Sequence, residues 1–169
     1  MRVRRAEPRD HAAIGEITVA AYAGLSEADE ASYGDKLRDA AARDREAELW
    51  VATSASETDG TVLDTVLGTV TVCHDGSPWR EIARGDEGEF RMLAVTPDAQ
   101  GRGVGAALVE LCVNRFREVG APGIVLSTLP AMHAAHRLYE RHGFVRAPER
   151  DWSPAPRVDL VAYHLDLAP

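Results

Sequence analysis

The chain is poor in cysteine and has no long apolar run. Cys73 and Cys112 are the only two cysteines in its 169 residues. They lack Cys-x-x-Cys spacing, so they predict neither a disulfide framework nor a zinc knuckle. No apolar stretch approaches the roughly 18 residues that would span a bilayer. The amino terminus, Met1–Arg5, is too short and too soon followed by acid to be a signal peptide. We therefore expect a cytoplasmic protein that does not insert in membranes.

The chain also lacks an excess of positive charge. Its formal net charge is −8 at pH 7, and a general nucleic-acid binder would instead show a basic patch or stripe. An acidic surface is compatible with a cationic substrate, although it also serves solubility. With 45% hydrophobic and 27% charged residues, the composition is that of an ordinary globular protein. We expect residues 1–169 to form one domain.

What the chain does have is a glycine-rich segment at residues 97–107, Pro-Asp-Ala-Gln-Gly-Arg-Gly-Val-Gly-Ala-Ala. It follows an apolar strand-like run, Phe90–Val95, and leads into an amphipathic helix. A helix start leaves N–H groups unpaired and carries a partial positive charge, and glycine allows a phosphate to approach them. No acid lies between Asp98 and Glu110, whereas Arg102 is present. The segment therefore predicts a site for an external anion.

Two known binding motifs fit these glycines, and a plain glycine-rich turn without a ligand is a third interpretation. Gly101, Gly103 and Ala106 fit the dinucleotide pattern G-x-G-x-x-G/A, but that pattern also needs an acid at the end of the next strand. The expected next strand, Gly123–Thr128, ends without one. The alternative, Gln100-x-x-Gly-x-Gly, resembles the pyrophosphate loop of the GNAT superfamily, the acyl-coenzyme A-dependent N-acyltransferases.

A second segment resembles the same family. Leu138-Tyr-Glu-x-x-Gly-Phe144 ends a short helix after Pro130, where a glycine cap followed by an apolar residue stops a helix. It is similar to the GNAT signature whose tyrosine reaches the coenzyme sulfur. One position departs from that signature: Met132 stands where many members have an asparagine that bonds the pantetheine arm or a water.

The resemblance implies an α/β fold of the α+β type. This fold is a single domain with a mixed, mostly antiparallel sheet of six to seven strands, about four flanking helices, and a splay between the two central strands. The hydrophobic pattern predicts strands at 2–6, 49–53, 65–73, 90–95, 123–128, near 144, and 158–167. It predicts helices from residue 8 to about 21, at 31–46, up to about 119, and at 131–142, with loops or linkers at 24–30, 54–64 and 74–88.

The resemblance also implies an enzyme that moves an acetyl group from acetyl-CoA to a primary amine by direct attack in a ternary complex. Tyr139 is the expected acid for the leaving thiolate, because a phenol is protonated at neutral pH; it is also a plausible core tyrosine. Glu89 is the expected base, with Glu87 as the nearest substitute. The resemblance implies that the Leu93 N–H faces the thioester oxygen. The expected coenzyme-binding residues are Leu93, Ala94, Val95, Gln100, Gly101, Arg102, Gly103, Val104, Gly105, Ala106, Ala107, Met132 and Ala135.

The acceptor is expected to be a small-molecule amine or a protein amine, and a homodimer is possible. In this family the first two helices and the loop before Phe90 wall the acceptor pocket, which nominates Tyr22, Leu25, Tyr33, Trp79 and Trp152. No metal is expected, because His133 and His136 lack a third ligand from another element. The alternative function is a non-catalytic acyl-CoA-binding or regulatory domain on the same fold.

Overall fold

The computed structural model describes residues 1–23, 30–58 and 61–167. Eight strands form the described sheet, in the order β1-β2-β3-β4-β5-β8-β6, with β7 paired to β8 beside this path. All described neighbours pair antiparallel except β4 and β5, so the predicted mixed, mostly antiparallel sheet is confirmed. The strands are β1 (Arg2–Arg5), β2 (Glu48–Thr58), β3 (Thr61–Cys73), β4 (Gly88–Val95), β5 (Gly123–Thr128), β6 (Val145–Arg146), β7 (Trp152–Ala155) and β8 (Val158–Asp166).

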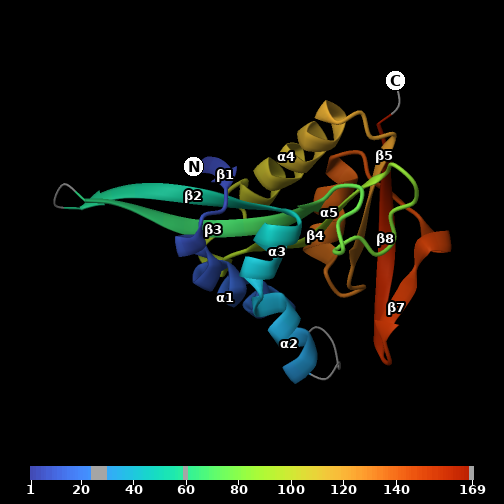
Figure 1. Cartoon of the computed structure of the whole chain (residues 1–169), viewed down its shortest axis with the longest axis horizontal. Coiled ribbons are helices and arrows are strands. Elements are labelled where there is room, and N and C mark those ends of the chain that lie inside the picture. The colour runs from blue at the N-terminus through green and yellow to red at the C-terminus, as the bar shows by residue number, and fades with distance from the viewer. Residues whose placement is uncertain (24–29, 59–60, 168–169) are drawn as a thin grey trace.

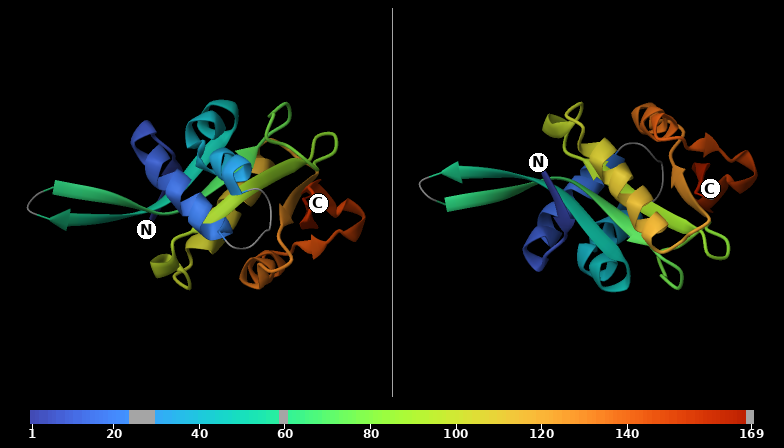
Figure 2. Two further views of the ribbon diagram at one scale, coloured as in Figure 1. Left: turned by 90° about the horizontal axis from the view of Figure 1, so that it is seen from below. Right: turned by 90° about the horizontal axis from the view of Figure 1, so that it is seen from above.

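Helices cover both faces of this sheet. On one side lie α1 (His11–Tyr22), α2 (Glu30–Arg38) and α3 (Ala40–Glu46); on the other lie α4 (Val104–Glu118) and α5 (His133–Arg141). Figure 1 shows α4 on one side of the β2–β3 ribbon and α1 to α3 on the other, and Figure 2 shows the two faces in turn. No described helix is both long and apolar enough to cross a bilayer.

The main core lies between α4 and the sheet. Leu108, Cys112 and Phe116 recur every fourth residue on α4, and all three are buried in one apolar cluster with Val72 and Phe90 of the sheet. This spacing places them on one stripe of the helix. Cys112 is thus a small buried hydrophobe, as its position on the apolar face predicts. The stripe holds α4, and with it the glycine segment at its start, against the sheet.

The sheet opens between its two central strands. β4 and β5 run parallel and pair only where Gly88 meets Ile124 and Glu89 meets Val125. Beyond this point β4 stays with β3 and β5 stays with β8. Met92 has φ of 51°, within a register shift against β3, which marks a β-bulge. The predicted splay between the central strands is therefore confirmed, and the bulge lies beside its opening.

Two expectations for local structure are wrong, and one strand is not predicted by the sequence. Residues 54–64 are not a linker: β2 and β3 stay paired up to Thr58 and Thr61, and the hairpin extends well beyond the rest of the sheet (Figure 2). A polar two-stranded ribbon shows little of the apolar alternation by which strands are recognised. The expected helix 31–46 is two helices, because Asp39 leaves the helical conformation and caps α3, accepting a bond from the Ala42 N–H at 2.9 Å. β7 was not expected at all.

Candidate active site

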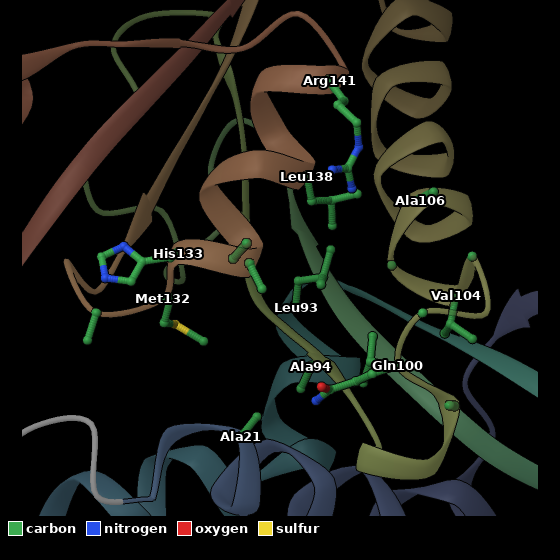
Figure 3. Close-up of a pocket in the computed structure, with 18 residues that line it drawn as sticks. Ala21, Leu93, Ala94, Gln100, Val104, Ala106, Met132, His133, Leu138 and Arg141 are labelled. Atoms are coloured by element: carbon green, nitrogen blue, oxygen red, sulfur yellow. The ribbon is translucent and has the colours of Figure 1, made fainter.

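A pocket of about 710 Å³ opens where β4 and β5 part. Figure 3 shows its walls: the end of β4, the glycine segment with the start of α4, and α5 with the turn before it. The lining residues from β4 to α4 are Leu93, Ala94, Val95, Ala99, Gln100, Gly101, Gly103, Val104, Gly105 and Ala106; the rest are Ala21, Ala131, Met132, His133, Ala134, Ala135, Leu138 and Arg141. Most are small or apolar, so the backbone is within reach of a ligand.

The glycine segment has a conformation that needs glycine. Gly101 and Gly103 have φ of 73° and 80°, in the left-handed region that residues with a side chain rarely adopt. Gly103 is the N-cap of α4, with no capping side chain and no acid in the first turn. Because an α-helix leaves its first N–H groups unpaired, those of Val104, Gly105 and Ala106 have no intrahelical acceptor. They are free to bind an anion.

The opposite wall is one stripe of α5. Ala134, Leu138 and Arg141 follow each other at helical spacing and line the pocket. Met132, which caps α5, also lines it. Its sulfur accepts a hydrogen bond from the Thr128 hydroxyl at 3.6 Å. The residue that replaces the usual asparagine therefore presents a thioether, a weak acceptor, to the pocket.

Tyr139 lies behind this wall, in the core. It is 5% exposed, and its ring packs against those of Phe90, Phe144 and Tyr163 at centroid distances of 5.9, 6.1 and 6.0 Å. Burial, with a smaller contribution from Tyr22, raises the pKa of the Tyr139 phenol. The phenol therefore keeps its proton at neutral pH, and the raised pKa makes it a weaker proton donor than an exposed tyrosine. Tyr139 is not one of the residues that line the pocket.

Glu89 is fully buried at the fork of the sheet, the last β4 residue paired with β5. Its Oε2 accepts hydrogen bonds from the N–H groups of Glu81, Ile82 and Ala83 at 2.9, 3.0 and 3.0 Å. Its Oε1 is buried and has no hydrogen-bond partner in the structure. Burial raises the pKa of this carboxyl, and the three N–H groups oppose that rise. Glu87, by contrast, is paired with Arg150 at 2.6 Å, which lowers the Glu87 pKa.

The structure brings most predicted coenzyme-binding residues to one pocket. Eleven of the thirteen line it; Arg102 and Ala107 do not. Several lining residues were missed, including Ala21, His133, Leu138 and Arg141. The helical spacing of Ala134, Leu138 and Arg141 was a usable signal for the α5 wall. No sequence signal indicated Ala21, because α1 reaches the pocket only through tertiary packing.

The residues expected to line the acceptor side lie in different structural surroundings. The Trp79 indole donates to Glu46 Oε2 at 3.1 Å, and the Trp152 indole donates to Ser127 Oγ at 3.0 Å. Trp79 is largely buried. Leu25 lies outside the described residues, as does the side chain of Tyr33. Within the described ranges, no three His, Cys, Asp or Glu side chains gather as metal ligands would.

The glycine segment and α5 have counterparts in a known family. Residues 9–144 match the family described as "Acetyltransferase (GNAT) family". This match spans most of the chain, which therefore belongs to the GNAT acetyltransferases. The dinucleotide-binding alternative fails on the fold as well, because the described sheet has only one parallel pair and is not doubly wound.

Individual relatives agree with this assignment. Mycothiol acetyltransferase of Cellulomonas flavigena is 35% identical over 137 residues, which cover 75% of this chain and 38% of that protein. A GNAT-family acetyltransferase from Staphylococcus aureus Mu50 has the same fold (TM-score 0.69, 14% identity, 99% of both chains). So does a GNAT-family acetyltransferase from Brucella melitensis in complex with acetyl-CoA (TM-score 0.60, 24% identity, 99% of this chain and 88% of that one). The chain thus spans about two fifths of the length of the mycothiol acetyltransferase that it matches.

Proposed function

We propose that the protein transfers an acetyl group from acetyl-CoA to a primary amine by direct attack in a ternary complex. The observation that carries this proposal is the pocket itself. One wall is a helix start with free N–H groups and no acid, the next is the free edge of a bulged strand, and the third is the α5 wall, which is mostly apolar and carries Arg141. Such walls fit a long donor with a pyrophosphate at one end and an amide-bearing arm, so the residues present fit acetyl-CoA.

Binding of the donor divides between two backbone segments. The N–H groups of Val104, Gly105 and Ala106 hold the pyrophosphate. The β4 groups from Leu93 to Val95, on the side where β5 has turned away, pair with the pantetheine arm as a missing strand would. When bound, acetyl-CoA supplies the acetyl thioester. The Leu93 N–H is assigned to its carbonyl oxygen, where negative charge develops.

Proton transfer is assigned to two buried groups. Glu89 accepts the amine proton, directly or through water, as the C–N bond forms. Its raised pKa places it closer to neutral pH than an ordinary carboxyl, and Oε1 is the oxygen left free for this task. Tyr139 gives its proton to the departing thiolate as the C–S bond breaks; because its ring lies behind the pocket lining, this proton also passes directly or through water.

A competing proposal is a domain that binds acyl-CoA and catalyses nothing. Met132 in place of asparagine favours it, because the polar contact that asparagine makes to the coenzyme is then absent or comes from another residue. The test is an amine panel of amino acids, amino sugars, polyamines and peptide amino termini, incubated with the full chain and acetyl-CoA. Release of the coenzyme thiol is the readout. Turnover of one amine that is lost in Tyr139→Phe supports the enzyme, and binding without turnover across the panel contradicts it.

A further inference from the structure

The residues that line the pocket carry almost no charge. Among the lining residues, Arg141 is the single one with a permanent charge, and none is Asp or Glu. This holds although the whole chain carries a net charge of −8. The pocket of an acidic protein is thus free of acid and contains one guanidinium.

That guanidinium has no partner within the part of the chain that the structure describes. Two arginines close to the fork of the sheet are neutralised by glutamates: Arg91 pairs with Glu81 at 2.6 Å, and Arg150 pairs with Glu87 at 2.6 Å. Figure 3 shows the Arg141 side chain leaving the last turn of α5, passing Leu138 and facing the side of the pocket formed by α4, at the level of Ala106. A planar, permanently charged fork in this position matches a phosphate group.

We propose that Arg141 binds the 3′-phosphate on the ribose of the coenzyme and makes the protein select CoA over 3′-dephospho-CoA. This inference depends on the proposed function. The pyrophosphate already has donors at the start of α4, so the cation on the facing helix is left for the third phosphate of the coenzyme. Neither the glycine segment nor β4 offers another charged side chain to the pocket. The preference therefore depends on a residue outside the glycine motif.

The test compares the dissociation constants of CoA and 3′-dephospho-CoA by calorimetry for the wild type and two variants. Arg141→Met keeps a long unbranched side chain and removes the charge. Arg137→Met is the matched control, because Arg137 lies one turn earlier on α5, is exposed, and does not line the pocket. Because Arg141 is exposed, we expect the wild type to bind CoA roughly fivefold more tightly than 3′-dephospho-CoA.

Arg141→Met should abolish this preference by weakening CoA alone, while Arg137→Met should retain it. The wild-type preference should also shrink when the salt concentration is raised to about 0.5 M. Equal weakening of both ligands by Arg141→Met would overturn the inference, since the lost contact would then be to a group that both share. A preference that survives in Arg141→Met would overturn it too. A wild type that binds neither ligand would overturn the proposed function, and this inference with it.

Discussion

A Cβ atom placed on Gly105 would lie 3.0 Å from Cδ2 of Leu138. These two residues belong to facing walls of the pocket, one on α4 and one on α5. In Gly105→Ala the leucine tip has to move by a few tenths of an ångström, which changes the shape of the pocket wall. We expect acetyl-CoA to bind several-fold more weakly to this variant, as measured by calorimetry.

Measuring the thermal stability of Gly105→Ala separates a loss of acetyl-CoA affinity from damage to the fold. Alanine favours a helix over glycine by up to about 1 kcal/mol, so Gly105→Ala should unfold at no lower temperature than the wild type. Adding Leu138→Val removes the δ-carbons and should recover much of the lost affinity. An alanine variant that binds acetyl-CoA as tightly as the wild type contradicts the close approach of the two walls.

Tyr139→Phe tests the proposed acid. Removing the phenol proton should lower kcat by about a hundredfold, with little change in the affinity for acetyl-CoA. The aromatic packing with Phe90, Phe144 and Tyr163 is retained, so the thermal midpoint should shift only slightly. Tyr163→Phe is the control from the same ring cluster; it loses a hydrogen bond to Glu140 and should keep its kcat. Unchanged turnover in Tyr139→Phe would assign this tyrosine to the core alone.

Glu89→Gln tests the proposed base through pH. Burial raises the folded-state pKa of Glu89 above its ordinary value of 4.5. The stability that this group contributes is therefore fully present below pH 4.5 and is lost as the pH rises through the folded-state pKa. Glutamine does not titrate. The difference in unfolding free energy, wild type minus Glu89→Gln, should therefore fall as the pH rises from 4.5 through the folded-state pKa of Glu89. Denaturant unfolding at a series of pH values measures it.

The same variant should change catalysis. In the wild type, kcat/KM should rise with pH through the raised pKa of Glu89, because the carboxylate is the active form. In Glu89→Gln this rise should vanish and the rate should fall by about a hundredfold. Glu87→Gln is the control, since Glu87 is engaged by Arg150. If Glu87→Gln removes the pH dependence and Glu89→Gln keeps it, the base has been assigned to the wrong glutamate.

The ion pair between Glu48 and Arg115 predicts behaviour in acid. Burial acts to raise the Glu48 pKa, but hydrogen bonds from Arg115 and Trp50 and the nearby His74 together lower it to about 2. Its contribution to stability is thus present above pH 4.5 and lost as the pH falls toward 2. Arg115→Met should lower the unfolding free energy by about 1–2 kcal/mol at pH 7. This difference in unfolding free energy from the wild type should become smaller as the pH falls from 4.5 toward 2.

Glu118→Gln is the control for this pair. Arg115 also contacts Glu118, which is 59% exposed, and an exposed pair contributes under about 1 kcal/mol. Denaturant unfolding of both variants at neutral and acid pH separates the two contacts. A cost for Arg115→Met that is the same at pH 2 and pH 7 contradicts the role of Glu48.

The glycine segment and α5 could be predicted from the sequence because their signals are local. Gly101 and Gly103 adopt backbone angles that other residues avoid, and the absence of acid near them is visible in the printed chain. The stripe Leu108, Cys112 and Phe116 likewise depends on spacing alone. These features place the start of α4 against the sheet, and the pocket follows from them.

Other features depend on contacts between distant segments. Arg43 is fully buried, and its guanidinium donates to the Leu37 carbonyl at 2.9 Å. This contact exists because the chain turns at Asp39, which a continuous helix would not do. Burial lowers the Arg43 pKa to about 10. The anchoring of the Glu81–Ala83 backbone by Glu89 is of the same kind, since no pattern near Glu89 indicates which N–H groups it will meet.

The most direct test of the account is thermal unfolding of the full chain with and without acetyl-CoA, using NAD as the control. A ligand at about 100 times its dissociation constant adds roughly 2.7 kcal/mol, enough to raise the midpoint by several degrees. If the glycine segment binds the coenzyme, the midpoint should rise with acetyl-CoA and should not change with NAD. No rise with acetyl-CoA, or an equal rise with NAD, would contradict the assignment of the glycine segment to the coenzyme.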